Sequence, residues 1–361
     1  HNISSHSDLT TYMAQAMQTQ GLSFDESLRL FSRTHMNDTP LAILWFWLVG
    51  QSGNAQWYPA SIAFVEYAII GYIFTDYSKS EGYGRRQYGL LIVLLIITLP
   101  LYNSVSSVRS TPALAIGILG FYLDFCKQVR NPAVYLLYVS SILIHSIGFL
   151  LIPLRIVCQI ECKNAKLAVV LTLCLLPLVN LFAYALNPFF LQFGFSVIQK
   201  VQSYVTGDSS DYALHVLEST FLQVKKWVSI AWAVVSICLL ILYAHDGRGR
   251  ADNLHARLCL LGCVLNAIII SFGIIITVPS YARFLYTAAP ISLLTITRRQ
   301  LMRKRDETEG RGNALYAALL GLYLVLMLAS FALNLYELPR RIAVGDLVQY
   351  SAIGFFGSLF T

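Results

Sequence analysis

Long apolar runs separated by short polar segments make up most of the chain. A helix that crosses the hydrocarbon core of a bilayer needs roughly 20 predominantly apolar residues, and several runs approach or exceed that length. The pattern therefore predicts an all-α, polytopic transmembrane protein with about 9–11 membrane segments, some of them broken or re-entrant helices. The expected segments lie near 59–75, 88–103, 112–126, 133–157, 167–186, 227–244, 257–278, 284–297, 314–336 and 347–361.

The composition excludes a soluble domain. Of 361 residues, 56% are hydrophobic and only 12% are charged, whereas ordinary globular proteins have about a quarter charged residues. The formal net charge of +7 would suggest a nucleic-acid partner in a soluble chain. Here most basic residues lie in short loops between apolar segments, so the excess reflects membrane orientation, and no nucleic-acid partner is expected.

The distribution of lysine and arginine predicts the topology if the 133–157 segment consists of two half-helices that enter and return near His145-Ser146. The inner side then carries 17 of the 26 basic residues and the outer side 9, as the positive-inside rule requires. Residue 1 then lies outside, which requires an odd number of upstream crossings. The inner segments in this scheme are 76–87, 127–132, 155–166, 245–257 and 298–313.

Two polar stretches are expected on the outer side. In the first, 7–20 and 23–34 have amphipathic patterns, and Ser23-Phe24-Asp25-Glu26 has the spacing of a capping box. The 41–50 segment is apolar but too short to span, which favours a re-entrant or interfacial helix. The chain is thus predicted to be one integral membrane domain over 1–361, with short extracytoplasmic helical caps at 1–58 and 187–226.

Motifs for several enzyme classes are absent. The sequence contains no Walker A loop, G-x-G-x-x-G, H-E-x-x-H or G-x-S-x-G. The seven cysteines show no disulfide framework. Cys158-x3-Cys162 and Cys259-x3-Cys263 have helical spacing, but no histidine or carboxylate neighbours are expected to complete a ligand set, so neither a metal site nor a cofactor is expected.

Four arginines at the outer ends of predicted spans break the charge rule: Arg109, Arg283, Arg340 and Arg341. Because an arginine costs about 2.5–3.5 kcal/mol at a helix centre and less near the interface, one retained on this side often has an anionic partner. A guanidinium matches phosphate oxygens bidentately, as a lipid-linked pyrophosphate would require. The alternative is snorkelling, or pairing with Glu337 or Asp346.

Other polar residues inside or beside the spans could take part in chemistry. His145 lies between apolar half-helices, where it could exchange protons or satisfy a carbonyl freed at the break. Glu66 is the only carboxylate in the middle of a predicted span, which suggests a functional role or a structural pair. Asp124 and Lys127 have the spacing of a local ion pair. The outer segments offer Asp8, Asp38, Tyr12 and Tyr204, which suit either sugar recognition or a membrane interface.

Several motifs occur in a familiar order. They are Ser7-Asp8-x3-Tyr12, Ser107-Val108-Arg109-Ser110-Thr111-Pro112-Ala113-Leu114-Ala115, Leu143-Ile144-His145-Ser146 and Ile198-Gln199-Lys200-Val201-Gln202-Ser203-Tyr204. This order resembles the EpsG/Wzy-type bacterial polysaccharide polymerases, which make O-antigen or exopolysaccharide, over much of 1–290. Ile144 stands where that family commonly has phenylalanine.

The resemblance implies a metal-independent glycosyltransferase of the bacterial inner membrane, with its site facing the periplasm. It would join oligosaccharide repeat units carried on undecaprenyl pyrophosphate, with the lipid bilayer and, in the same pathway, a chain-length regulator and a flippase as partners. Arg109 and Arg283 would hold the leaving pyrophosphate, and His145 would be the base, with Asp38 or Glu66 in reserve. Substrate-binding positions would be Asp8, Tyr12, Asp38, Glu66, Tyr204, Tyr281, Arg340 and Arg341.

Two other functions fit the same residues. A ligase or a transferase that uses a polyprenyl-phosphate sugar would differ only in its substrates. A transporter or flippase for a lipid-linked sugar would also need outer arginines and a broken helix. The sequence shows no two-fold repeat, which favours the enzyme.

Overall fold

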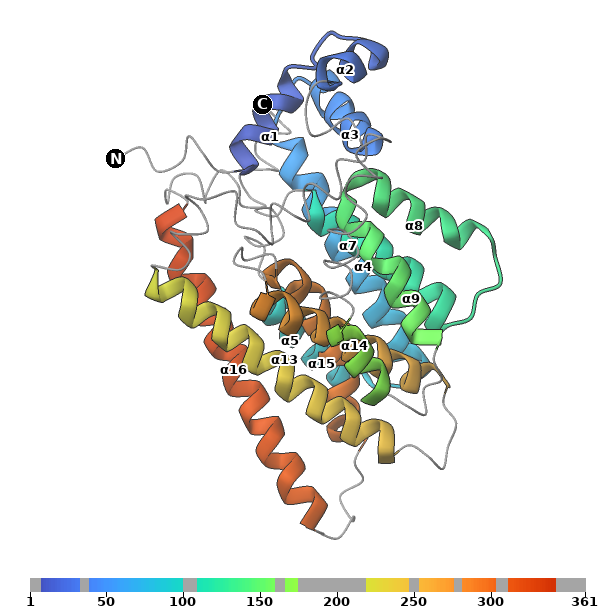
Figure 1. The fold of residues 1–361 in the computed structure, drawn as a ribbon, viewed down its shortest axis with the longest axis vertical. Coiled ribbons are helices and arrows are strands. Elements are labelled where there is room, and N and C mark those ends of the chain that lie inside the picture. Colours follow the sequence, from blue (N-terminus) through green and yellow to red (C-terminus); the bar gives the residue numbers. More distant parts are fainter. Residues whose placement is uncertain are drawn as a thin grey trace.

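In the computed structural model, the described residues are 8–32, 39–99, 109–159, 166–174, 219–246, 253–275, 281–302 and 311–341. This part of the chain forms helices and no strand, which confirms the predicted all-α class. Figure 1 shows the arrangement of the helices. The predicted segment at 347–361, most of 167–186 and most of the 187–226 cap lie outside the described residues.

Four helices are long and apolar enough to cross a membrane, which confirms a polytopic protein. They are α4 (Trp57–Ser80), α13 (Thr220–Asp246), α14 (Asn253–Ile275) and α16 (Arg311–Arg341). Two more helices pack among them: α5 (Arg85–Thr98) and α15 (Tyr281–Met302), which contains Pro290. At the predicted span 88–103, the described helix α5 begins three residues earlier and ends at Thr98, and 100–103 lie outside the described residues.

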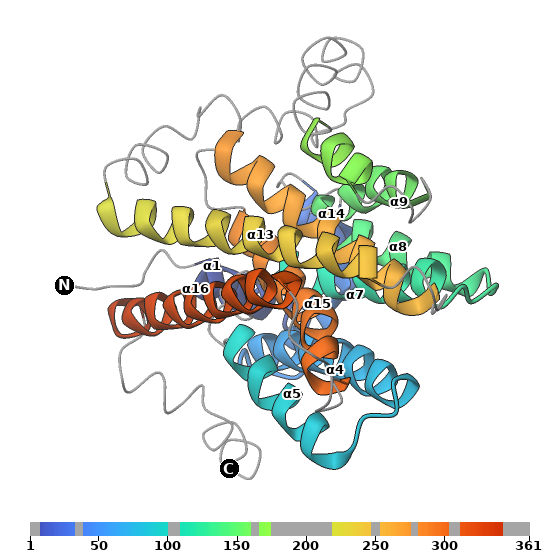
Figure 2. The same cartoon turned by 90° about the horizontal axis from the view of Figure 1, so that it is seen from below.

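The helix α14 lies in the interior of the bundle. Of its apolar window 83% is buried, against 22% for α16. The helices α13 and α15 pack on α14, and α13 and α16 lie side by side (Figure 2). Large apolar side chains on α16, such as Leu322, Val325 and Leu328, are exposed, as expected for a surface that faces lipid.

The predicted break in the 133–157 segment is confirmed. The apolar helix α8 (Ala133–Ile144) ends at His145, whose backbone is extended (φ −155°, ψ 137°). A short 3₁₀ turn, η2 (Ser146–Leu150), and α9 (Leu151–Gln159) follow. Before them, α7 (Ser110–Phe121) continues as a π turn, η1 (Tyr122–Cys126).

The chain reverses direction at this break. Tyr138 on α8 and Arg155 on α9 both reach Asp124 in η1, at 3.4 and 2.5 Å. Two residues on opposite sides of the break can meet the same carboxylate only if α9 turns back toward η1. We call α8, η2 and α9 the re-entrant hairpin.

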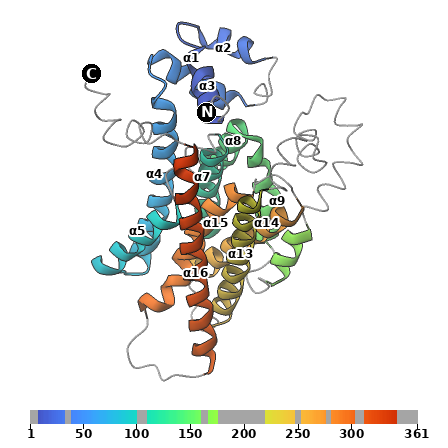
Figure 3. The same ribbon diagram turned by 90° about the vertical axis from the view of Figure 1, so that its left-hand side faces the viewer.

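The first three helices, α1 (Asp8–Met17), α2 (Phe24–Phe31) and α3 (Pro40–Gln51), form what we call the N-terminal cap. Figure 3 shows these helices beside the start of α4. The cap has its own apolar cluster, which includes Phe31 and Phe46 and extends to the first turns of α4. The capping box predicted at Ser23 and Glu26 is present at the start of α2. The apolar α3 is 12 residues long, too short to span, as predicted.

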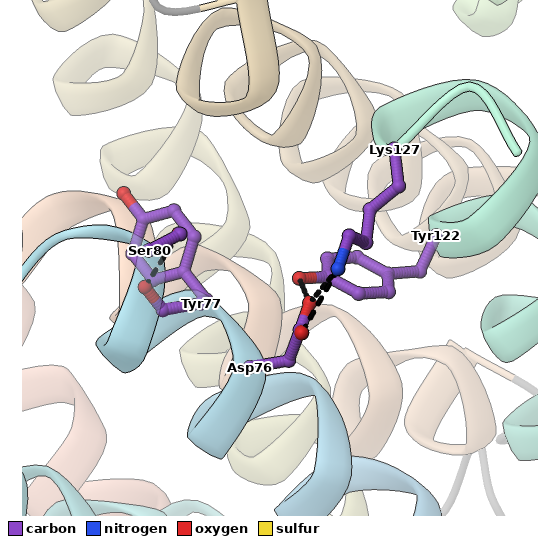
Figure 4. A network of polar contacts seen from close by, with 5 residues as sticks. All are labelled: Asp76, Tyr77, Ser80, Tyr122 and Lys127. Carbon is purple, nitrogen blue, oxygen red and sulfur yellow. Dashed lines mark hydrogen bonds and ion pairs between the residues drawn. The ribbon is translucent and has the colours of Figure 1, made fainter.

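The opposite end of the bundle, which we call the polar end, holds a set of ion pairs and hydrogen bonds between segments predicted to share the inner side. Lys127 pairs with Asp76, and Arg298 pairs with Glu81, at 2.8 and 2.6 Å. Figure 4 shows the first pair, in which Tyr122 also donates to Asp76. The pairing expected between Asp124 and Lys127 is wrong, because each finds a partner on another helix.

The same end contains a buried contact that the sequence did not indicate. The hydroxyl of Tyr77 lies 2.6 Å from Nδ1 of His255, and Nε2 of His255 lies 3.5 Å from the sulfur of Cys259. Cys259 thus has a histidine neighbour four residues earlier on α14, which the sequence analysis overlooked. Among the described residues, no three histidine, cysteine or carboxylate side chains are placed to hold a metal.

Candidate functional site

Arg109 is a buried arginine where the N-terminal cap meets α7. It is the residue directly before α7, and 8% of its surface is exposed. Its Nη2 donates a 2.8 Å hydrogen bond to the hydroxyl of Tyr12, and its guanidinium lies 4.8 Å from the centre of the same ring. Its Nη1 lies 3.5 Å from the hydroxyl of Thr39. Three segments far apart in sequence therefore meet at one cation.

The described side chains that contact Arg109, those of Tyr12 and Thr39, are neutral. Within the described ranges, no carboxylate forms an ion pair with it, and its buried Nε has no hydrogen-bond acceptor. Burying a charge is costly unless it is paired. The start of α7 adds positive potential at this point, because the first amides of a helix have no acceptor within the helix. The site is thus suited to an anion.

The packing of α7 on α8 sets the position of His145. The hydroxyl of Ser141 donates to the carbonyl of Ala113, and Gly117 is tightly packed against Ser141. The two helices run antiparallel, so the four residues from Ser141 to His145 and the four from Ala113 back to Arg109 lead toward the same end. At 1.5 Å per residue, Arg109 and His145 lie within about one helical turn of each other along the axis.

His145 also ends α8 and begins the 3₁₀ turn. Its Nδ1 accepts a 3.0 Å hydrogen bond from the backbone N–H of Ile147. Its own N–H donates to the carbonyl of Ser141 at 3.0 Å. In the neutral ring the proton is therefore assigned to Nε2, because the lone pair of Nδ1 is engaged. In this geometry Nδ1 of His145 is engaged as an acceptor and the proton of the neutral ring is on Nε2.

The structure places the other predicted residues as follows. Glu66 lies in the middle of α4 and is 2% exposed. Tyr281 and Arg283 belong to the first turn of α15, which has Arg298 near its other end, at the polar end. This directs the backbone of Arg283 toward the Arg109 end, while its side chain and that of Tyr281 lie outside the described set.

The remaining predicted positions lie at helix ends or outside the described residues. Arg340 and Arg341 are the last residues of α16, and Asp8 is the first of α1, with side chains outside the described set. Asp38 and Tyr204 lie outside the described residues. The structure thus brings Arg109 and Tyr12 into contact and places His145 within about one helical turn of Arg109 along the axis. The roles of the other predicted residues remain proposals.

Two residues of this site were missed by the sequence analysis. Thr39, which precedes Pro40 at the start of α3, has no pattern of its own. Tyr58 is 2% exposed, packs on Phe46 at 5.0 Å and interacts electrostatically with Arg109. It sits in a Trp-Tyr-Pro sequence that is typical of a membrane interface, and this hid its relation to the arginine.

Comparison with known proteins gives one family. The family model described as the EpsG family matches residues 39–339. No curated protein and no solved structure matches the chain. The matched range runs from α3 to near the end of α16 and therefore includes Arg109, His145 and Arg283. It leaves out α1 with Tyr12, α2, and the last two residues of α16, Arg340 and Arg341.

Proposed function

The chain belongs to the EpsG family, and from this premise we propose that it is a bacterial polysaccharide polymerase that acts on lipid-linked sugars. The proposed substrates are oligosaccharide repeat units carried on undecaprenyl pyrophosphate. One unit provides a hydroxyl and the other provides the anomeric carbon. The single observation that carries the proposal is Arg109, a buried cation whose described neighbours are neutral.

The reaction asks two things of the protein. The hydroxyl oxygen forms a bond to the anomeric carbon, while the bond from that carbon to the pyrophosphate oxygen breaks and its electron pair leaves with the pyrophosphate. The leaving group gains negative charge as the bond breaks, and a preorganised cation in a dry site lowers the barrier. Arg109 is proposed to supply that charge, with Arg283 reaching the same group from α15.

The hydroxyl proton needs an acceptor. His145 lies at the required depth, but its Nδ1 is engaged by the amide of Ile147. We therefore assign His145 to donate a hydrogen bond from Nε2 to an oxygen of the substrate, and keep Glu66 and Asp38 as candidates for the base. This differs from the role that the sequence suggested for His145.

The two ends of the bundle support one orientation of the protein in the membrane. Segments rich in lysine and arginine meet at the polar end, and the N-terminal cap lies at the other. By the positive-inside rule, the Arg109 site then faces the outer side of the cytoplasmic membrane. A cysteine introduced at the exposed Leu30 of α2 should react with an impermeant maleimide added to intact cells, and one introduced at 303–310 should not. The reverse pattern would contradict this orientation.

The experiment that tests the function is repeat-unit ladder formation in a deletion strain. Complementation uses wild type, Arg109→Ala, Arg109→Lys and Arg283→Ala. The matched control is Arg29→Ala, which removes an exposed arginine of the N-terminal cap whose partner is Asp25, four residues earlier. We expect single lipid-linked repeats in the deletion strain, full ladders with the control, and no ladder with Arg109→Ala at normal membrane level.

Arg109→Lys should restore little, since lysine lacks the fork that binds two phosphate oxygens. Full ladders with Arg109→Ala would remove Arg109 from the site. Because the proposed cation is an arginine rather than a metal, polymerisation in isolated membranes should also continue in excess EDTA.

A broken helix beside a buried cation also suits a transporter. Unchanged polymer length in the deletion strain, with lipid-linked repeats trapped inside, would favour that function.

A further inference from the structure

One carboxylate at the polar end holds both arms of the re-entrant hairpin. Arg155 of α9 binds Asp124 through Nε at 2.5 Å and through Nη2 at 3.3 Å. Tyr138 of α8 reaches the same carboxylate at 3.4 Å. The guanidinium of Arg155 also lies 5.3 Å from the ring centre of Phe125, the neighbour of Asp124. Asp124 is therefore the point where α7, α8 and α9 are joined.

The local backbone and burial favour a built contact rather than a loose surface pair. Asp124 lies in the π turn η1, and such turns occur frequently at functional sites. The side chains of Arg155 and Asp124 are only 23% and 12% exposed. A bidentate arginine–carboxylate pair fixes orientation as well as distance.

The opposite end of the same hairpin carries His145. His145 follows Tyr138 by seven positions, which is about 10 Å along the helix axis. The tip is tightly packed, because a Cβ on Gly148 would lie 2.7 Å from the backbone nitrogen of Ile142. Closely packed helices transmit a displacement rather than absorb it. A shift of the arms against α7 would therefore move His145 relative to Arg109.

We propose that Asp124 and Arg155 are positioning residues for the transfer reaction. Their ion pair fixes the register of the re-entrant hairpin on α7, and so holds His145 at the depth of Arg109. Neither residue touches the substrate. This inference rests on the proposed function, because it needs the Arg109 end to be the site of reaction.

The polar end offers a matched control. Asp76 and Lys127 form a second ion pair at the same end, with side chains that are 24% and 33% exposed. Their contacts join α4 to η1 and its C-cap, and neither residue belongs to the re-entrant hairpin (Figure 4). Loss of this pair removes a similar ion pair without releasing an arm of the hairpin.

The kinetic test uses purified protein in lipid nanodiscs with a lipid-linked repeat unit. The variants are Asp124→Asn, Arg155→Gln and both together, with Asp76→Asn and Lys127→Met as controls. We expect kcat to fall about 10- to 100-fold in the Asp124 and Arg155 variants with KM nearly unchanged, because misplacement by about 1 Å can cost 10²-fold. The double variant should lose no more than the worse single variant, as residues acting through one contact do.

A second readout does not depend on activity. Spin labels introduced through unnatural amino acids at the exposed positions Phe64 of α4 and Phe149 of η2 report the distance from α4 to the hairpin tip. We expect this distance to shift or broaden in Asp124→Asn and to stay unchanged in Asp76→Asn.

The outcomes distinguish the proposed function from the positioning role of Asp124 and Arg155. An inactive wild type would contradict the proposed function. An active wild type with unchanged kcat in the Asp124 variants, or an equal loss in the controls, would overturn the positioning role alone. A rise in KM with constant kcat would also overturn it, since that change indicates lost substrate binding rather than misplacement.

Discussion

The hydroxyl of Tyr12 accepts a 2.8 Å hydrogen bond from Nη2 of Arg109, 97 residues away in the sequence. The ring of Tyr12 also lies against the guanidinium. One helix of the N-terminal cap thus orients the cation without neutralising it, which leaves the charge available to an anion. The cap is therefore part of the proposed site and more than a cover for it.

Substituting Tyr12 tests this relationship. Tyr12→Phe keeps the ring and removes the hydrogen bond, which for a charged group contributes about 1.5–3 kcal/mol. We expect donor KM to rise at least several-fold and Tyr12→Leu to be worse, because the ring contact is then lost as well. Tyr72→Phe is the control, since Tyr72 is an exposed tyrosine of α4. Equal KM values for all three variants would show that Arg109 is oriented by other groups.

The capping box of α2 predicts a pH dependence of the N-terminal cap. The pKa of Glu26 is lowered below 4.5 because three groups stabilise its carboxylate. The largest effect is the hydrogen bond from the backbone N–H of Ser23, the next is the hydrogen bond from the Ser23 hydroxyl, and the smallest is the charge of Arg29. The stabilisation is present above pH 4.5 and is lost as the pH falls through the lowered pKa. Hydrogen exchange of α2 should accelerate in this acid range in wild type, after correction for intrinsic rates. Glu26→Gln should remove that step, and a step that persists would assign it to another group.

Two glycines allow a paired test of the hairpin tip. In Gly148→Ala the new methyl would lie 2.7 Å from the backbone of Ser141 and Ile142, so the tip must shift. We expect about a 10-fold or greater loss of ladder formation, because the shift moves His145. Gly71→Ala on α4 meets no atom within 4 Å and should leave activity unchanged. Thermal unfolding in detergent checks that both variants fold.

The sequence predicted the features that depend on local patterns. Apolar run lengths predicted the helices, and the sequence around His145 predicted the break. The basic loops predicted that 76–87, 127–132 and 298–313 share one side, and the ion pairs of Asp76 and Glu81 show that these segments meet at one end of the bundle. It could not predict which side chains meet across helices. Asp124 has Lys127 three residues away, yet it pairs with Arg155, which the turn back of α9 brings to it, while Lys127 pairs with Asp76.

The arginine site shows the same limit. The position of Arg109 on the wrong side of the charge rule marked it in the sequence. The hydroxyls of Tyr12 and Thr39 come from the N-terminal cap, and their contact with Arg109 depends on tertiary packing that no local pattern specifies. Residue types near an interface look alike whether they anchor the protein or bind a ligand.

His145 can act on the substrate through Nε2 or only cap the turn at Ile147, and two substitutions distinguish these roles. Asn places an oxygen near Nδ1 of histidine and can accept the N–H of Ile147, whereas Gln places a donor near Nε2. If Nε2 acts on the substrate, His145→Asn should keep normal membrane levels and lower kcat, by about 10²-fold. His145→Gln should retain more activity than His145→Asn, provided that the helix break survives. If His145 serves only to cap the turn at Ile147, the order reverses: His145→Asn restores full ladders and His145→Gln does not. Ladder length, kcat and protein level measured together for both variants and His145→Ala distinguish these outcomes, because capping alone would change level and activity in parallel.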